Sequence, residues 1–74
     1  SYLLQAEYEM AKDFLEKAVE LDPAVPYIYN NLGIVYENLG NLNKAQENYK
    51  KALEINSDYQ KAKDNLKRIE NKLN

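Results

Sequence analysis

The sequence predicts an all-α fold made of antiparallel helix-turn-helix repeats, and three observations lead to that prediction. Apolar residues recur three and four positions apart over most of the chain, which is the spacing of one helix face. Short segments that contain Pro, Gly or Asn, residue types that begin or end helices, separate these stretches. A shift of 34 residues also superposes parts of the chain, with identities at Ala11/Ala45, Lys17/Lys51, Ala18/Ala52, Glu20/Glu54, Asn31/Asn65, Leu32/Leu66 and Leu39/Leu73. We therefore predict four helices, at about residues 2–22, 26–39, 42–55 and 58–73.

The first helix is predicted to run without a break from about residue 2 to residue 22. A strict repeat would place a turn at Ala6 and Glu7, but Ala6 stands where the complete repeat has Gly40. This part of the chain contains strong helix formers and no helix breaker. One continuous apolar stripe supports the single helix: Leu4, Tyr8, Ala11, Leu15 and Ala18, flanked by Leu3, Met10, Phe14 and Leu21.

The second and third helices are predicted to form a hairpin with a tight turn. Pro26 suits the first turn of the second helix, where backbone N–H groups have no partner inside the helix. Gly40 is expected to take the left-handed conformation that ends a helix, and Asn41 is expected to cap the next one. Gly33 costs the second helix ~1 kcal/mol relative to Ala, so we expect it where another helix comes close. Ala45, also small, is its expected neighbour; a simple kink at Gly33 is the alternative.

The fourth helix is predicted to start after Ser57, because Ser57-x-x-Gln60 has the pattern of a capping box. Lys67 and Glu70 stand where the second helix has the Gly and the Tyr that a following helix would pack against. These charged residues predict that no further helix is stacked there, so the fourth helix is expected to close the array.

The stretch that spans the second and third predicted helices carries a spaced set of residues: Tyr29-x-x-Leu32-Gly33-x-x-Tyr36, then Ala45-x-x-x-Tyr49, then Ala52. This set resembles the signature of the tetratricopeptide repeat (TPR) family. Numbered from Pro26, the signature positions fall in register, although Tyr29 replaces the preferred Trp, Tyr49 the preferred Phe and Ser57 the usual Pro. The resemblance implies a single TPR-like α-solenoid domain over residues 1–74. It would comprise a half repeat in 1–25, a complete repeat in 26–59 and a capping helix in 60–74.

Composition excludes several classes of function. The chain has no Cys and no His, which removes thiol nucleophiles, histidine bases and zinc-finger ligands. Its net charge of −2 argues against a nucleic-acid partner, and no apolar run approaches the ~20 residues of a membrane span. We therefore expect no catalytic residues, no metal, no cofactor, no nucleic acid and no membrane partner.

The resemblance implies a module that binds a protein or peptide segment in a concave groove lined by the first helices of successive repeats. Some relatives bind a peptide's C-terminal carboxylate through Lys, Asn and Arg; Asn31 and Lys61 match two of those positions, whereas Asn65 stands where the Arg would be. A branched aliphatic side chain at Ile34 suggests a ligand with an apolar side chain. The candidate groove residues are Tyr27, Asn30, Asn31, Ile34, Glu37, Asn38, Lys61 and Asn65.

The alternative function is a structural unit that assembles with itself and binds no separate ligand. The first helix of the first repeat is nearly absent, so the apolar stripe of the first predicted helix would lack its cover. Residues 1–22 carry six acidic and two basic side chains, and residues 59–74 carry five basic and two acidic ones, which favours contact between chains. A symmetric homodimer through the first helices is expected, with a head-to-tail stack and a monomer as alternatives. Its contact residues would be Leu3, Leu4, Met10 and Phe14.

Overall fold

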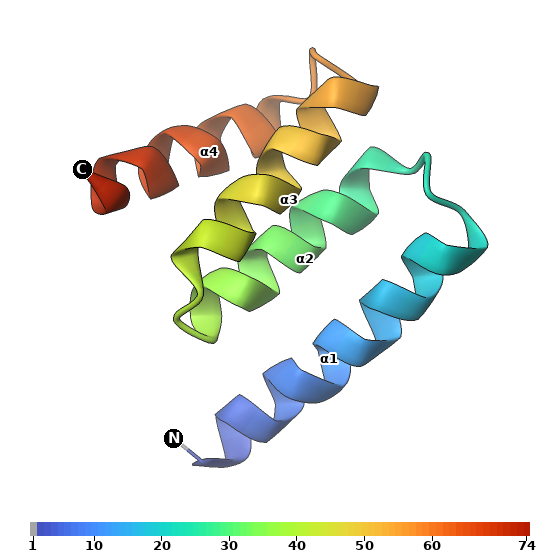
Figure 1. Ribbon diagram of the computed structural model, residues 1–74, viewed down its shortest axis with the longest axis vertical. Helices are drawn as coiled ribbons and strands as arrows, with labels where there is room; N and C mark the ends of the chain where they lie inside the picture. The colour runs from blue at the N-terminus through green and yellow to red at the C-terminus, as the bar shows by residue number, and fades with distance from the viewer. Residues whose placement is uncertain (1) are drawn as a thin grey trace.

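The computed structural model describes residues 2–74, and within them the fold is all-α. Four helices follow one another, each antiparallel to the one before it (Figure 1). Their bounds are Tyr2–Leu21 (α1), Pro26–Asn38 (α2), Leu42–Ile55 (α3) and Gln60–Leu73 (α4). The predicted fold class is confirmed, and the predicted bounds agree to within two residues. None of the described helices combines the length and apolar character needed to cross a bilayer.

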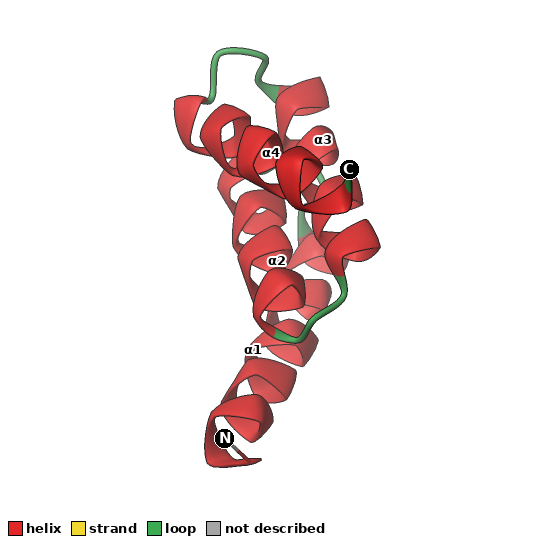
Figure 2. Ribbon diagram, turned by 90° about the vertical axis from the view of Figure 1, so that its left-hand side faces the viewer, coloured by secondary structure: helices red, strands yellow, loops and turns green. Residues whose placement is uncertain are grey.

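Helix α1 is unbroken, as predicted, and no turn occurs at Ala6 and Glu7. Its last turn is completed by the Asp22 N–H, which donates to the carbonyl oxygen of Ala18 at 2.9 Å. The Asp22 carboxylate then accepts a hydrogen bond from the Ala24 N–H at 3.2 Å, which holds the turn into α2. The N-terminal end of α1 reaches past the turn between α2 and α3 (Figure 2).

The turn between α2 and α3 has the predicted chemistry. Gly40 has a positive φ of 86°, a conformation that residues with a β-carbon rarely adopt. The Asn41 N–H donates to the carbonyl oxygen of Tyr36 at 2.9 Å, which satisfies one of the unpaired carbonyls at the end of α2. The Asn41 side chain accepts from the Lys44 N–H at 3.2 Å and so caps α3.

The predicted capping box at the start of α4 is wrong. Helix α4 begins at Gln60, and its N-cap residue is Tyr59, which makes no side-chain capping bond. The Gln60 amide points along its own helix instead and donates to Asp64 at 2.9 Å. Asn56 arranges the preceding turn, because its side chain accepts from the Asp58 N–H at 3.1 Å. The capping box is absent because α4 begins three residues after Ser57 and the Gln60 side chain is bound to Asp64 of its own helix.

The core lies between α2, α3 and α4, and Gly33 marks its closest crossing. Gly33 is buried against the ring of Tyr49, which is itself completely buried. The expected neighbour, Ala45, packs instead with Tyr49 and Ile69 in the same cluster. Gly33 is thus required by a close helix approach, as predicted, but the side chain that it admits is the large Tyr49 rather than the small Ala45.

Candidate functional site

Five of the eight predicted groove residues present an accessible surface on α2 and α4. On α2 the spacing of Tyr27, Asn31, Ile34 and Asn38 places them in one stripe along the helix. Tyr27, Ile34 and Asn38 are exposed, and Asn31 is half-buried. Lys61 is exposed at the start of α4. We name these five residues the α2 stripe with Lys61; they carry apolar, amide and cationic groups side by side.

Asn30 and Asn65 do not belong to that accessible surface, because they bind each other. Asn30 is buried, and its amide oxygen accepts a hydrogen bond from the Asn65 amide nitrogen at 2.9 Å. The Asn65 oxygen in turn accepts from an Arg68 guanidinium nitrogen at 2.8 Å. The Asn30–Asn65 bond joins α2 to α4, so both amides are already used in holding the two helices together.

Glu37 is the centre of a second α2–α4 connection. Its Oε1 accepts from the Tyr49 hydroxyl at 2.9 Å and from Arg68 Nη2 at 2.6 Å. Its Oε2 accepts from Arg68 Nε at 3.1 Å and from Lys72 Nζ at 3.0 Å. Only 12% of the Glu37 side chain is exposed, and the hydrogen bonds from Arg68 are the main reason that its pKa falls to about 2. The carboxylate is therefore charged at neutral pH, and each of its oxygens accepts two hydrogen bonds.

Sequence reasoning missed the partners of Glu37. Arg68 and Lys72 stand at the same repeat positions as Ile34 and Asn38, so the 34-residue offset assigns them to the side of α4 where the groove was predicted. Glu37, the one acidic residue of α2, was the signal that could have identified Arg68 and Lys72 as its partners. Arg68 and Lys72 keep about half of their side chains exposed, so this side of α4 remains basic.

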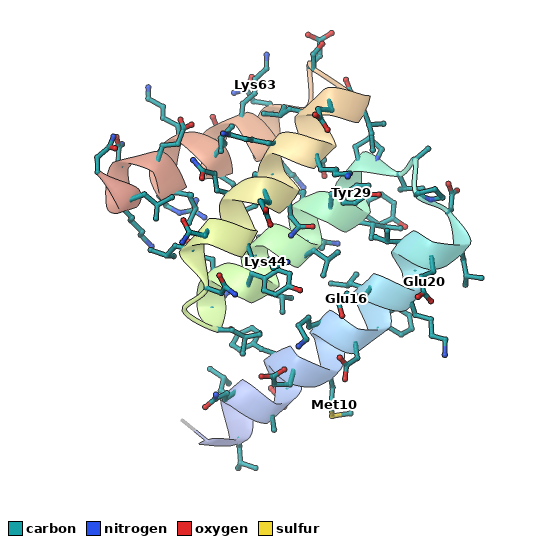
Figure 3. The ribbon with its side chains drawn as sticks, viewed as in Figure 1. Met10, Glu16, Glu20, Tyr29, Lys44 and Lys63 are labelled. Carbon is teal, nitrogen blue, oxygen red and sulfur yellow. The ribbon has the colours of Figure 1, made fainter. Side chains whose placement is uncertain are left out.

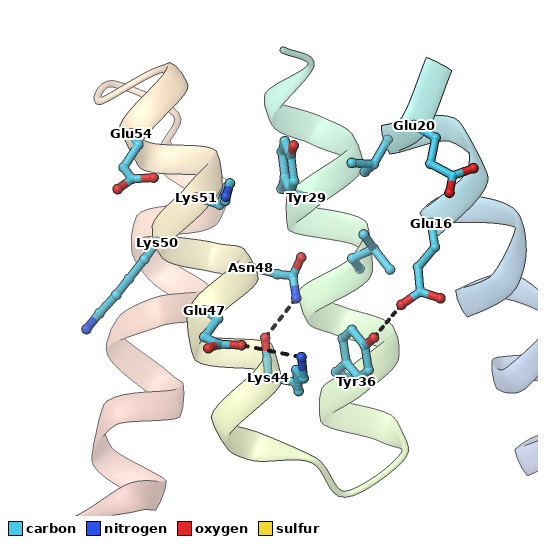
Figure 4. Close-up of a pocket in the computed structure, with 12 residues that line it drawn as sticks. Glu16, Glu20, Tyr29, Tyr36, Lys44, Glu47, Asn48, Lys50, Lys51 and Glu54 are labelled. Atoms are coloured by element: carbon cyan, nitrogen blue, oxygen red, sulfur yellow. Dashed lines mark hydrogen bonds and ion pairs between the residues drawn. The ribbon is translucent and has the colours of Figure 1, made fainter. Parts of the chain in front are cut away.

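A cavity of about 700 Å³ lies on the other side of α2, and the sequence did not predict it. Figure 4 shows Glu16 of α1 on one side of it and Lys44 of α3 on the other, with Tyr29 and Tyr36 of α2 between them. These two tyrosines lie about 180° around α2 from the α2 stripe, so the cavity and the predicted groove face opposite ways. The cavity arises because α1 and α3 flank α2 without closing over it, an arrangement that no local pattern encodes.

Tyr36 connects α1 to α2 at the edge of this cavity. Its hydroxyl donates to Glu16 Oε2 at 2.6 Å, a hydrogen bond between side chains that joins α1 to α2. Burial, together with this bond, raises the pKa of Tyr36 to about 12, so the hydroxyl stays protonated and keeps donating at neutral pH.

The residues predicted for self-association lie on α1. Leu3, Met10 and Phe14 are highly exposed, and Met10 points away from the other helices in Figure 3. Leu4 is half-exposed and lies beside Tyr8, near the end of α2. Leu21, which was predicted only as a flanking apolar residue, is exposed at the far end of the same helix.

The described residues hold no group of three His, Cys, Asp or Glu side chains that could bind a metal ion. The titratable contacts that the structure does show are structural pairs within or between helices, such as Lys12 with Glu9 at 3.1 Å.

Comparison with known proteins gives two matches to family models. The model described as "Tetratricopeptide repeat" matches residues 26–59, the bounds predicted for the complete repeat. The model described as "TPR repeat" matches residues 1–40, more than half of the chain. Both are helix-turn-helix repeat models, in agreement with the fold described above.

Two curated proteins are also similar to this chain. Heat shock protein STI1 of Saccharomyces cerevisiae is 32% identical over 68 residues, which are 92% of this chain and 12% of that protein. Uncharacterized protein ycf37 of Pyropia yezoensis is 34% identical over 55 residues, which are 74% of this chain and 31% of that protein. The chain thus spans a small part of each of these relatives.

Proposed function

Because this chain belongs to the tetratricopeptide repeat family, whose repeats generally mediate protein–protein interactions, we propose that it is a non-catalytic module that binds a peptide on the α2–α4 face. The peptide would lie along Tyr27, Asn31, Ile34 and Asn38 and reach Lys61 at the start of α4. Asn30, Glu37 and Asn65 would act indirectly, by fixing α2 against α4.

The observation that carries this proposal is that the residues which join α2 to α4 differ from the residues that are accessible on that face. The groups that join the two helices are satisfied by one another, so the neighbouring side chains are presented on a surface that is already ordered. A surface ordered in advance loses less entropy on binding, which raises affinity. Tyr27 and Ile34 supply apolar contact area, while Asn31 supplies an amide that can pair with a peptide backbone.

The charges of the groove favour an acidic peptide with at least one apolar side chain. Lys61, Arg68 and Lys72 bring three positive charges to α4, whereas Glu37 brings one negative charge from α2. A carboxylate of the peptide would meet a net positive wall while its apolar side chain covers Ile34. The same peptide with its carboxylates replaced by amides is expected to bind more weakly.

The proposal is tested by one substitution and its matched control. Peptides selected from a displayed random library on the immobilised chain would be labelled and titrated by fluorescence anisotropy. Ile34→Glu is expected to weaken their binding about 10-fold or more, because a charge replaces an apolar contact at the centre of the face. Ile55→Glu places the same change on α3 at a residue of equal exposure, 39% against 37% for Ile34, and is expected to change the affinity by less than about twofold.

Two results would contradict the proposal. One is a library that yields no peptide with an affinity better than about 1 mM. The other is a set of selected peptides that bind Ile34→Glu as tightly as the unchanged chain, or that lose as much on Ile55→Glu. Circular dichroism of both variants would show that each is still helical.

A further inference from the structure

Helix α1 carries a stripe that faces no other helix of the chain. Its apolar members are Leu3, Met10, Phe14 and Leu21, each between 72% and 85% exposed. Glu7 and Lys17 occupy the two remaining positions of the same stripe, so the six residues follow one another at intervals of 4, 3, 4, 3 and 4. This is the spacing of the contact positions in a pair of helices that pack along their length.

The stripe is accessible to a second helix. It lies roughly 100° around α1 from the side that packs on α2, where Tyr8, Ala11, Leu15 and Ala18 are partly buried. Figure 1 shows α1 at one edge of the molecule, with α2 on its inner side and nothing on its outer side. Among the described residues outside α1, the exposed large apolar side chains are Tyr27 and Ile34 on α2, Ile55 on α3 and Leu73 on α4, so none of these helices carries as many as α1.

We propose that this stripe is an interface between two copies of the chain, in which their α1 helices pack antiparallel about a two-fold axis near residue 12. The order of the six residues carries the proposal. When the second copy of α1 runs antiparallel to the first, each of these residues faces one of complementary chemistry. Leu3 then meets Leu21 of the second copy, and Met10 meets Phe14. Glu7 meets Lys17, so every layer pairs groups of matching chemistry.

The two charged residues exclude the parallel arrangement. Parallel α1 helices would bring Glu7 against Glu7 and Lys17 against Lys17, so two layers would be repulsive. Antiparallel packing replaces both layers by Glu–Lys pairs. Glu7 and Lys17 are exposed, and neither makes an ion pair with any other residue in 2–74, so both are available across the interface.

The other carboxylates of α1 do not enter the contact. Glu9, Asp13, Glu16 and Glu20 project at least about 80° around the helix from the centre of the stripe, on its solvent side or toward the cavity. None of the side chains of the α2–α4 face takes part either. The self-association is therefore independent of peptide binding, and each can fail without the other.

Charge exchange tests the contact and its direction together, with sedimentation equilibrium as the readout. The unchanged chain is expected to form dimers at concentrations below about 1 mM. Glu7→Lys is expected to weaken the dimer about 10-fold or more, because it creates two Lys–Lys layers. The double variant Glu7→Lys/Lys17→Glu is expected to restore the affinity to within about threefold, since the layers are again of opposite charge. Glu9→Lys, the same charge change on the other side of α1, is expected to have an effect below about threefold.

Cysteine pairing gives a second readout, which reports which residues face each other, and the chain has no Cys of its own to interfere. A mixture of Leu3→Cys chains and Leu21→Cys chains is expected to form a disulfide between copies under mild oxidation, whereas Leu3→Cys chains alone are expected to form little. Efficient pairing of Leu3→Cys with itself, or a dimer insensitive to Glu7→Lys, would overturn the antiparallel contact. A monomer at every concentration up to about 1 mM would overturn the interface itself and leave the stripe to another partner.

Discussion

At the scale of single residues, Gly33 and Tyr49 set the distance between α2 and α3. A β-carbon built on Gly33 would lie 2.6 Å from Cδ1 and 2.8 Å from Cζ of the Tyr49 ring, well inside contact distance. The ring cannot swing away, because it is completely buried and its hydroxyl is bound to Glu37. One methyl group at this position would therefore have to push the two helices apart.

We expect Gly33→Ala to lower the free energy of unfolding by about 2 kcal/mol, even though Ala favours a helix by ~1 kcal/mol over Gly. Urea unfolding followed by circular dichroism measures the change. In a Tyr49→Leu background, where the ring is gone, the same substitution should cost much less. An alanine variant as stable as the unchanged chain would show that the crossing is looser than described.

The same pair shows what residue types can and cannot predict. A glycine inside a helix predicts a close neighbour, and the structure confirms one. The neighbour itself was misassigned, because Ala45 and Tyr49 are four residues apart on one face of α3 and either could stand opposite. Which one does so depends on how the two helices are shifted along each other, and the size of a side chain does not encode that shift.

At the scale of elements, polar side chains on the α2–α4 face join α2 to α4. The Glu37 carboxylate receives four hydrogen bonds from three residues, two of them on α4. Because the pKa of Glu37 is lowered from 4.5 to about 2, the folded state binds the proton more weakly than the unfolded state. The stabilisation is complete above pH 4.5 and is lost as the pH falls toward about 2.

Glu37→Gln is expected to lower the free energy of unfolding at pH 7 by about 2 kcal/mol, because it removes charge-assisted bonds to Arg68 and Lys72. The difference between the variant and the unchanged chain should shrink between pH 4.5 and about 2 and nearly vanish below that range. Urea unfolding at several pH values measures it.

Glu47→Gln is the control, since Glu47 makes only an exposed pair with Lys44 at 3.9 Å, which is worth less than about 0.5 kcal/mol. Equal losses in the two variants, or a Glu37→Gln loss that does not depend on pH, would contradict the role given to Glu37.

The helices themselves were predictable to within two residues because their signals are local. Periodic apolar residues, Pro23 and Pro26, and the Gly40–Asn41 turn each act within a few positions of the chain. The start of α4 was less predictable, because the Gln60 side chain had two possible hydrogen-bond partners. In the structure it donates to Asp64 of its own helix. Such a choice depends on side-chain geometry that the order of residues leaves open.

At the scale of the whole molecule, the four helices create three different surfaces. The α2–α4 face carries the α2 stripe with Lys61, the opposite side of α2 holds the cavity between α1 and α3, and the outer edge of α1 carries the apolar stripe. The α2–α4 face was predicted from repeat positions, and the apolar stripe of α1 was predicted from the length of that helix. The cavity could not be foreseen, because it depends on the gap between two helices that are not neighbours in the chain.

The central claim is that a partner peptide binds the α2–α4 face rather than either of the other two surfaces, and one measurement compares all three. A ¹⁵N-labelled chain would be titrated with the tightest selected peptide and followed by amide chemical shifts. The account predicts that the largest shifts occur at Tyr27, Asn31, Ile34 and Lys61. Largest shifts at Leu32 and Lys51 around the cavity, or at Met10 and Phe14 on α1, would contradict it.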